Sequence, residues 1–246
     1  MIHLEHVRKS FGDNTVLKDV DFVLRPGEVV GLVGPSGGGK SVLLKILGKV
    51  LEPTSGTIEY ENEQGEEKEL TVGFLFQEGA LFDSMTVLEN VAFAAEHTLV
   101  GKSHEEIYDT SQEILAEVGL AKSGGKLPGQ LSGGMRRRVG IARALVAHPE
   151  LVLLDDPTGG LDPVAASVII DLILELHQLY RPTVVIVSHD IRRLLPKVER
   201  VLSLFNGTIV NDSAPRELEK SASEDVLQFL RTRFDFGVFH QEASHS

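Results

Sequence analysis

The sequence predicts an α/β protein whose central sheet is largely parallel and is covered by helices on both faces. Three observations predict this class. Short apolar runs of strand length recur along the chain, helix-like segments alternate with them, and a glycine-rich turn joins an early apolar run to a helix. Near-continuous apolar strands indicate a parallel sheet, because neither face of such a sheet meets water.

Composition places the chain among ordinary soluble globular proteins. It has 246 residues, 42% hydrophobic and 24% charged, enough for one large domain with a sizeable core. A net charge of -12 argues against nucleic acid as the main partner, because phosphate neutralisation gives nucleic-acid binding its largest nonspecific contribution. There is no cysteine, no secretion signal at the start and no apolar run of the roughly 18 to 20 residues that span a bilayer, so we expect a cytosolic protein without disulfides.

The opening portion predicts an antiparallel patch instead of alternating strands and helices. Residues 2–7 (IHLEHV), 16–24 (VLKDVDFVL) and 57–64 (TIEYENEQ) have the pattern of antiparallel strands. The acidic stretch ENEQGEEKEL at 61–70 predicts a solvated loop.

The parallel strands are predicted from four apolar or β-branched runs that are too short for helices. They lie at 28–34, 72–77, 151–155 and 183–188. Helices are predicted at 41–51, 135–147 and 164–180. Before the last of these, Asp162 can cap the helix and Pro163 can occupy its first position, where a missing N–H costs nothing.

Two further features complete the predicted architecture. Helical signals predominate from about residue 80 to 147, which predicts a helical subdomain inserted between two strands of the sheet. Asn206-Gly207 predicts a hairpin with a tight turn. We expect a single domain over 1–246, with a C-terminal extension over about 214–246.

The segment GPSGGGKS matches the pattern G-x-x-x-x-G-K-[ST] between a predicted strand and a predicted helix, the context that makes the match specific. Backbone N–H groups of such a loop surround phosphate oxygens, the helix presents its positive end, Lys40 adds a charge and Ser41 can ligate magnesium. The alternative is a glycine-rich turn without a ligand. The predicted nucleotide-binding residues are Gly34, Pro35, Ser36, Gly37, Gly38, Gly39, Lys40 and Ser41.

The run LVLLDDPTGGLDP stops at two neighbouring aspartates, Asp155 and Asp156. A carboxylate at the end of a strand beside the phosphate-loop strand orders the magnesium shell in P-loop enzymes, which is the role predicted for Asp155. The side chain of Asp156, one residue further on, points in a different direction and can contact the water molecule that attacks the phosphate. The alternative is that both aspartates cap a turn ahead of Pro157.

The motif LSGGM at 131–135 opens a predicted helix. Ser132, Gly133 and Gly134 offer a hydroxyl and unobstructed backbone N–H groups at the start of this helix, which is a second anion site. The chain therefore has two helix starts that can bind phosphate but only one phosphate loop.

In their order along the chain, these motifs resemble those of the ATP-binding-cassette (ABC) ATPases over essentially the whole sequence. The series is the phosphate loop, a glutamine after a strand, LSGG, an acidic strand end, GLDP and a strand-terminal histidine. The resemblance implies a P-loop NTPase (RecA-like) core, ATP and Mg²⁺ as cofactors, and ATP hydrolysis coupled to transport. In that family the LSGG signature of one subunit completes the ATP site of another, so a homodimer or a closely related second chain is implied.

The resemblance also implies roles for individual residues. Phe11 is similar to the aromatic residue that stacks on adenine, and Asp162 to the residue of the loop that crosses the dimer interface. Gln77 matches the glutamine that reaches magnesium and the attacking water, and His189 the switch histidine at the γ-phosphate. Without the resemblance, a core role would be the better interpretation of both Phe11 and His189. The implied catalytic residues are Asp156, His189 and Gln77, and the implied metal ligands are Ser41, Gln77 and Asp155.

Three positions depart from the family pattern. Asp156 stands where glutamate is usual, Met135 where glutamine is common after LSGG, and Gly159 where serine is frequent. Aspartate and glutamate have nearly equal basicity, but aspartate reaches roughly 1 Å less far, and a misplacement of that size can cost about 10²-fold in rate. We expect slow but real hydrolysis.

The segment FQEGALFDSMTVLENVAF at 76–93 resembles the ATPase subunits of Mla-type transporters, which work with MCE proteins on phospholipids or other hydrophobic substrates. This implies a membrane permease as partner, an MCE-type lipid-binding partner and a place on the cytoplasmic face of the inner membrane. Leu81, Phe82, Met85 and Val87 are expected to expose an apolar patch for a short helix of the permease, or else to cover the core of the helical subdomain. The consecutive arginines 136–138 are expected on a solvated or interface-rim helix face and not in a lipid-binding site.

Three alternatives stay open at the level of the sequence. The tail VLQFLRTRFDFGVFH at 226–240 either grips a neighbouring ATPase subunit, as in Mla-type ATPases, or packs on its own domain. The chain serves a membrane permease, or it is a soluble ABC ATPase of an assembly complex such as one that builds iron–sulfur clusters. A third possibility is a clamp that binds ATP and hardly hydrolyses it.

Overall fold

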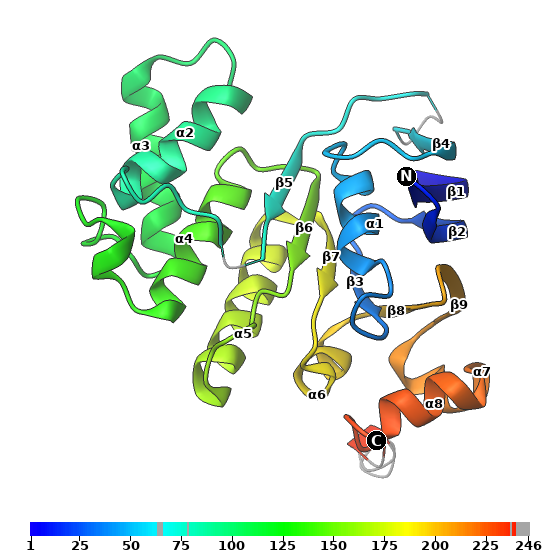
Figure 1. Ribbon diagram of the computed structural model, residues 1–246. Helices are drawn as coiled ribbons and strands as arrows, with labels where there is room; N and C mark the ends of the chain where they lie inside the picture. Colours follow the sequence, from blue (N-terminus) through cyan, green and yellow to red (C-terminus); the bar gives the residue numbers. More distant parts are fainter. Residues whose placement is uncertain (63–65, 78, 237, 240–246) are drawn as a thin grey trace. The chain divides into compact units, whose positions relative to one another are not determined.

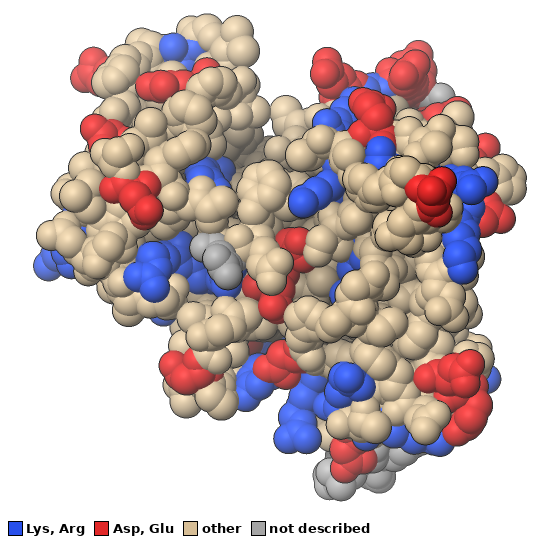
Figure 2. Space-filling model, in the orientation of Figure 1, with Lys and Arg blue, Asp and Glu red and all other residues tan. Residues whose placement is uncertain are grey.

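The computed structural model describes residues 1–62, 66–77, 79–236 and 238–239, and the chain divides into two compact units (Figure 1). The first unit comprises Met1–Lys68 and Val185–Ser246, and the second comprises Glu69–Val184. On the face shown in Figure 2, basic and acidic side chains are interspersed. Each unit has its own core of apolar side chains.

The antiparallel patch of the first unit has the predicted topology. Strand β1 (Ile2–Phe11) pairs antiparallel with β2 (Asn14–Leu24) on one side and with β4 (Ser55–Tyr60) on the other. Alternate residues of β1 and β2 are buried, so one face of the patch packs inward and the other faces solvent. The acidic stretch at 61–70 follows β4, and its residues 63–65 lie outside the described part of the chain.

The rest of the first-unit sheet carries the strand that leads to the phosphate loop. Strand β3 (Val29–Val33) is buried along its whole length and pairs parallel with β8 (Arg200–Phe205). Strands β8 and β9 (Thr208–Ser213) form the predicted hairpin, with Asn206 at φ 51° and Gly207 at φ 83°. Two consecutive positive φ values are what a tight turn of this type requires, which confirms the Asn-Gly prediction.

Helix α1 (Lys40–Leu47) follows β3 through the glycine-rich turn. It ends earlier than the predicted 41–51, because the chain breaks helical geometry at Gly48 and Lys49, the latter at φ 54°. The first unit also contains α6 (Ile191–Leu194), η2 (Leu195–Lys197), η3 (Pro215–Glu217), α7 (Leu218–Ser221) and α8 (Glu224–Arg231).

The second unit pairs two strands with four helices. Strands β5 (Val72–Leu75) and β6 (Leu151–Asp155) are parallel, with Gly73 opposite Val152. A Cβ on Gly73 would lie 1.9 Å from the carbonyl oxygen of Ala144, so glycine is what allows the last turn of α4 (Gly133–Leu145) to approach β5. The helices and the short η1 are α2 (Val87–Thr98), α3 (His104–Glu117), η1 (Pro128–Gln130), α4 (Gly133–Leu145) and α5 (Pro163–Tyr180), and β7 (Thr183–Val187) crosses the unit boundary.

Helices α2, α3 and α4 pack on one another, as Figure 1 shows. The first two begin with capping boxes, Thr86 with Glu89 and Ser103 with Glu106, which satisfy N–H groups at each helix start. These helices fall in the region expected to be helical at 80–147.

Helix α5 corrects one expectation from the sequence. Its 18 residues have a mean hydropathy of 1.3, so by length and composition α5 could cross a membrane. Its apolar residues Ala166, Ile169, Ile170, Ile173 and Leu176 are buried, and the helix packs against α4. The long apolar run is therefore explained by its place in the core of the second unit.

The C-terminal segment packs on the first unit. Val226, Leu227 and Leu230 of α8 are buried, as are Phe234 and Phe236 beyond it. Of the two hypotheses for the tail, the described residues favour packing on its own unit, and a grip on a neighbouring subunit stays a prediction. Residues 237 and 240–246, which include His240 and His245, lie outside the described part of the chain.

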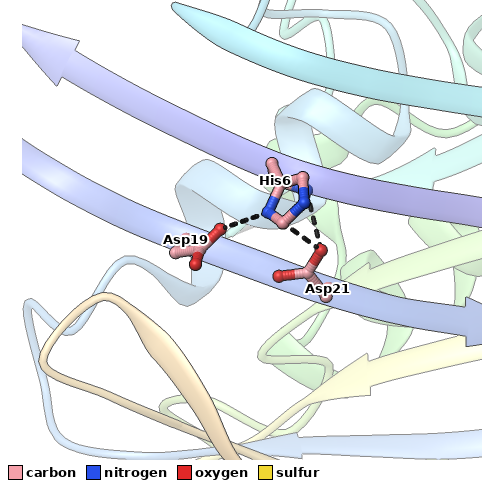
Figure 3. A group of neighbouring side chains, drawn as sticks. All are labelled: His6, Asp19 and Asp21. Atoms are coloured by element: carbon pink, nitrogen blue, oxygen red, sulfur yellow. Dashed lines mark hydrogen bonds and ion pairs between the residues drawn. The ribbon is translucent and has the colours of Figure 1, made fainter.

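A β-bulge brings an imidazole between two carboxylates on the solvent face of the patch (Figure 3). The register of β1 on β2 places Glu5 and His6 opposite the single residue Asp21, and His6 has φ 52°. The His6 Nδ1 lies 3.0 Å from Asp19 Oδ1 and 3.6 Å from Asp21 Oδ1. All three side chains are exposed, so His6 forms surface ion pairs with Asp19 and Asp21. One imidazole nitrogen and two carboxylate oxygens are also close enough together to bind a metal ion.

These contacts make His6 a pH-dependent element. The hydrogen bond with Asp19, with the charge of Asp21 beside it, raises the pKa of His6 above its ordinary value of 6.5. A raised folded-state pKa means that this contribution to stability is full below pH 6.5 and is lost as the pH rises through the folded pKa. Asp19→Asn is expected to lower the pKa of His6 in an NMR titration of the imidazole, and Asp13→Asn, in the adjacent turn, serves as the charge-matched control. An unchanged His6 pKa in Asp19→Asn would contradict the assignment.

Candidate nucleotide-binding site

The glycine-rich turn is held by close contacts that only glycine permits. A Cβ on Gly34 would lie 2.1 Å from the carbonyl oxygen of Leu204. Gly39 has φ 96°, and a Cβ there would lie 2.9 Å from Leu17 Cδ2. Residues with side chains at these positions would push the loop away from β8 and β2, so the glycines fix its path.

Lys40 closes this turn from inside. Its side chain is buried, and Nζ donates hydrogen bonds to the carbonyl oxygens of Gly34, at 2.9 Å, and Pro35, at 2.7 Å. Helix α1 starts at Lys40 and has no side-chain cap, and the start of a helix favours negative charge. An ammonium, a helix start and a glycine-lined backbone together fit a polyphosphate.

Two further predicted residues lie in the first unit. Phe11 ends β1 and is 49% exposed, with Lys9 Nζ at 5.2 Å from its ring centroid. An aromatic ring this exposed is available for stacking and is not a core residue, which removes the alternative kept open from the sequence. His189 follows β7 and is exposed, between Ser188 and Asp190.

The second unit supplies the two aspartates. Strand β6 is buried throughout and ends at Asp155, and Asp156 follows in the left-handed region at φ 49°. Both side chains are buried, at 5% and 8% exposure. In the part of the chain that the structure describes, Asp156 Oδ1 is buried without a hydrogen-bond partner. An unmet buried acceptor is costly, so Asp156 Oδ1 is suited to accept a hydrogen bond from a ligand or a water molecule.

The remaining predicted residues lie on the surface of the second unit. Ser132 caps α4, where its hydroxyl accepts from Met135 N at 3.3 Å, and Gly133 and Gly134 form the first turn. Asp162 caps α5 by accepting from Val164 N and Ala165 N, each at 3.0 Å, as predicted from its place before Pro163. Ser132, Gly133 and Asp162 are exposed, and Gln77 is exposed after β5. These groups can meet a second molecule.

In the arginine run at 136–138, Arg136 is exposed as expected, whereas Arg137 departs from the expected solvated or interface-rim face. Arg137 is only 7% exposed, and its Nη2 donates to the carbonyl oxygen of Gly159 at 2.9 Å. Arg136 Nη1 donates to the carbonyl oxygen of Leu131 at 2.7 Å. Helical spacing could have predicted the burial of Arg137, because position 137 lies three and four residues before the buried Gly140 and Ile141 and shares their face of the helix.

Of the four residues expected in an apolar patch after Gln77, only Phe82 lines a groove of about 420 Å³ within the described part of the second unit; Leu81, Met85 and Val87 do not line it. It is lined by aromatic side chains, among them Phe76, Phe82 and Phe93, and Phe82 stands edge-on to Phe93 at 5.0 Å. Val87, expected in the exposed patch, is fully buried at the start of α2 and belongs to the core of the helices.

Arg143 forms the polar edge of this groove. It donates Nη1 to the carbonyl oxygen of Ala80 and Nη2 to that of Gly79, each at 2.7 Å. Burial lowers the pKa of its guanidinium. Arg143 therefore holds the backbone of the segment after Gln77 in place, a role that no sequence motif indicated.

The fold and these motifs together define an ATPase of the ABC cassette class. A solved structure described as a post-hydrolysis dimer of the ATP-binding cassette MJ0796 bound to ADP and Pi superposes with a TM-score of 0.76 at 33% identity, over 87% of this chain and 99% of that one. Fold class, P-loop core and cofactors agree with the predictions: ATP with Mg²⁺ is what this class uses.

The chain belongs to the ABC transporter family. The family model described as ABC transporter matches residues 17–159. "Protein TRIGALACTOSYLDIACYLGLYCEROL 3, chloroplastic" of Arabidopsis thaliana is 37% identical over 96% of this chain and 74% of its own length. "Probable ribonucleotide transport ATP-binding protein mkl" of Mycobacterium tuberculosis is 40% identical over 94% of this chain and 67% of its own length. The chain is thus an ABC transporter ATP-binding protein, a class whose cassettes pair and work with permease subunits on the cytoplasmic side of a membrane.

Proposed function

We propose that this chain powers a membrane permease that moves phospholipid or another hydrophobic substrate. The lipid class rests on one observation, the relative that bears the name of a galactolipid and aligns with 96% of the chain. The mycobacterial relative is named for ribonucleotide transport, so a polar substrate is the competing class. The segment at 76–93, which resembles Mla-type ATPases, favours the lipid class.

In this proposal the first unit binds the nucleotide. Phe11 stacks on the adenine, and the turn from Gly34 to Ser41 surrounds the phosphates with backbone N–H groups. Lys40 exchanges its two carbonyl contacts for phosphate oxygens, which are stronger partners for an ammonium. His189 acts as the switch histidine at the terminal phosphate.

The proposal also includes a magnesium ion, held by the ligands that the family resemblance implies. Ser41 in the first unit, and Asp155 and Gln77 in the second, offer hydroxyl, carboxylate and amide oxygens, which are the donors Mg²⁺ prefers. Magnesium, when bound, neutralises charge on the phosphates. Asp156 accepts the proton of the attacking water, a role for which its unpartnered Oδ1 is suited.

Two copies of the chain complete the proposed ATPase. Ser132 and Gly133 of one copy would cover the nucleotide of the other, and both are exposed as this requires. The helix start at α4 and the exposed Asp162 supply N–H groups and a carboxylate at such an interface. ATP binding would close the pair, and hydrolysis would let it reopen.

The groove of the second unit is the proposed seat of the permease. Its exposed aromatic side chains, Phe82 at 41% and Phe93 at 36%, are typical of a surface that receives an apolar helix. An MCE-type lipid-binding protein is the proposed further partner, by resemblance of the segment at 76–93.

A charge in the groove tests the permease site. Phe82→Asp is expected to weaken copurification with an integral membrane subunit by at least about 10-fold, because central aromatic contacts contribute 2 kcal/mol or more to an interface. Val100→Asp, at a 91% exposed position of the same unit, is the matched control and should copurify normally. Basal ATPase activity should stay within about twofold in both variants. Equal copurification of both variants would contradict the groove assignment.

The substrate class is tested by affinity purification from native membranes with mass spectrometry of bound proteins and lipids. An integral membrane subunit with bound phospholipid is expected. Recovery of soluble iron–sulfur assembly proteins without a membrane subunit would favour the assembly ATPase. Transport of labelled ribonucleotide in reconstituted vesicles, without lipid transport, would favour the polar substrate.

A further inference from the structure

We infer that Gly159 is a positioning residue for Asp156, and that the two form a matched pair in which an absent side chain makes room for a short carboxylate. A Cβ built on Gly159 would lie 2.4 Å from Asp156 Oδ2 and 2.9 Å from Asp156 Cγ. The Asp156 carboxylate therefore lies in the space that any other residue at 159 would fill. This inference rests on the proposed catalytic role of Asp156.

Backbone conformation does not explain the glycine. Gly159 is absent from the positive-φ residues of the described chain, whereas its neighbour Gly160 has φ 73°. A residue with a side chain can adopt the backbone of Gly159, so the constraint is the space beside it. The resemblance to ABC ATPases implies that serine is frequent at this position, and the sequence does not indicate what the glycine is for.

Both members of the pair are fixed in place. The carbonyl oxygen of Asp156 accepts a hydrogen bond from Gly159 N at 3.1 Å, which closes a tight turn. The carbonyl oxygen of Gly159 accepts one from Arg137 Nη2 at 2.9 Å, and Arg137 is itself buried. Since α4 anchors the turn through Arg137, an added Cβ would displace the carboxylate and not the backbone.

The left-handed backbone of Asp156 strengthens this inference. Asp156 has φ 49°, a region that aspartate and asparagine tolerate better than longer side chains do. The carboxylate is 8% exposed, with Oδ2 against Gly159 and Oδ1 buried without a partner in the described residues. The pair thus holds one oxygen against the turn and leaves the other as a free acceptor.

The expected effect follows from the displacement. Moving Oδ2 from 2.4 Å to an ordinary 3.4 Å contact requires a shift of about 1 Å (3.4 − 2.4 = 1.0). A displacement of this size at a reacting group can cost about 100-fold in rate. Gly159→Ala is therefore expected to lower kcat for ATP hydrolysis by about 10- to 100-fold, with KM and the affinity for a nonhydrolysable ATP analogue within about twofold of wild type.

Gly125→Ala is the matched control. Its added Cβ meets nothing within 4 Å and its φ lies outside the left-handed region, so kcat should be unchanged. The same substitution in a second variant separates the effect on the Asp156 carboxylate from an effect on packing. In an Asp156→Ala chain, which has no carboxylate to displace, Gly159→Ala should leave thermal unfolding and analogue affinity unchanged.

Three results would overturn the pairing. One is a wild-type kcat in Gly159→Ala. Another is an equal loss of kcat and analogue affinity, which would show that Gly159 supports the nucleotide site as a whole. The third is the same fall in unfolding temperature with and without the Asp156 carboxylate. A wild-type rate in Asp156→Asn is a different failure: it would remove the catalytic role of Asp156, and the unfolding comparison would still judge the pairing.

Discussion

Lys40→Ala is expected to weaken ATP binding by at least about 100-fold and to remove measurable hydrolysis. The ammonium is buried in the glycine-rich turn, where it now donates to two backbone carbonyls. Hydrogen bonds to charged groups contribute about 1.5 to 3 kcal/mol each, so loss of two phosphate contacts exceeds the ~2.7 kcal/mol that corresponds to 100-fold. Calorimetric titration with Mg-ATP measures this loss directly.

Lys45→Ala gives the matched control for this experiment. Lys45 lies on the same helix, in its last turn and away from the glycine-rich turn, so removing its charge should change affinity by no more than about twofold. Thermal unfolding of both variants checks that α1 stays folded. Equal ATP affinity of Lys40→Ala and wild type would remove the phosphate-loop assignment.

Asp156→Asn is expected to lower kcat by about 10²- to 10⁴-fold with little change in nucleotide affinity, because a general base contributes an effect of this size. Asparagine has nearly the same shape and tolerates the left-handed backbone at φ 49°. The substitution therefore removes the negative charge while it keeps the turn. Steady-state ATPase rates at saturating ATP measure the loss.

Asp156→Glu separates charge from reach. The variant keeps a carboxylate and is expected to hydrolyse ATP, unlike Asp156→Asn. If the short reach of Asp156 limits the wild-type rate, Asp156→Glu is expected to raise kcat by up to about 100-fold. The left-handed backbone and the contact with Gly159 disfavour a longer side chain and reduce this gain. Equal rates in all three proteins would show that Asp156 has no catalytic role.

Most of the secondary structure could be predicted because its signals are local. Buried strands such as β3 and β6 show as unbroken apolar runs, and Asn206-Gly207 specifies its own turn. Element ends were less predictable. Helix α1 stops at Gly48, inside a run whose apolar pattern continues, because the backbone beyond it turns left-handed at Lys49.

The amino-acid sequence by itself determined the chemistry of the nucleotide motifs. In the turn from Gly34 to Ser41, donors, glycines and the start of α1 lie within eight consecutive residues, so the groups that can bind phosphate are already present in one short segment. The same is true of Ser132 at α4 and Asp162 at α5, each of which caps the helix that follows it.

Only the tertiary structure decided what surrounds these motifs. It buried Arg137 against the carbonyl oxygen of Gly159 and placed the carboxylate of Asp156 in the space beside Gly159. It also decided between the two hypotheses for Val87, which lies in the core and not in an exposed patch. The physical reason is that burial and contact depend on which distant segments pack together. A sequence pattern records the residues that prefer burial, and the fold alone selects the neighbours they meet.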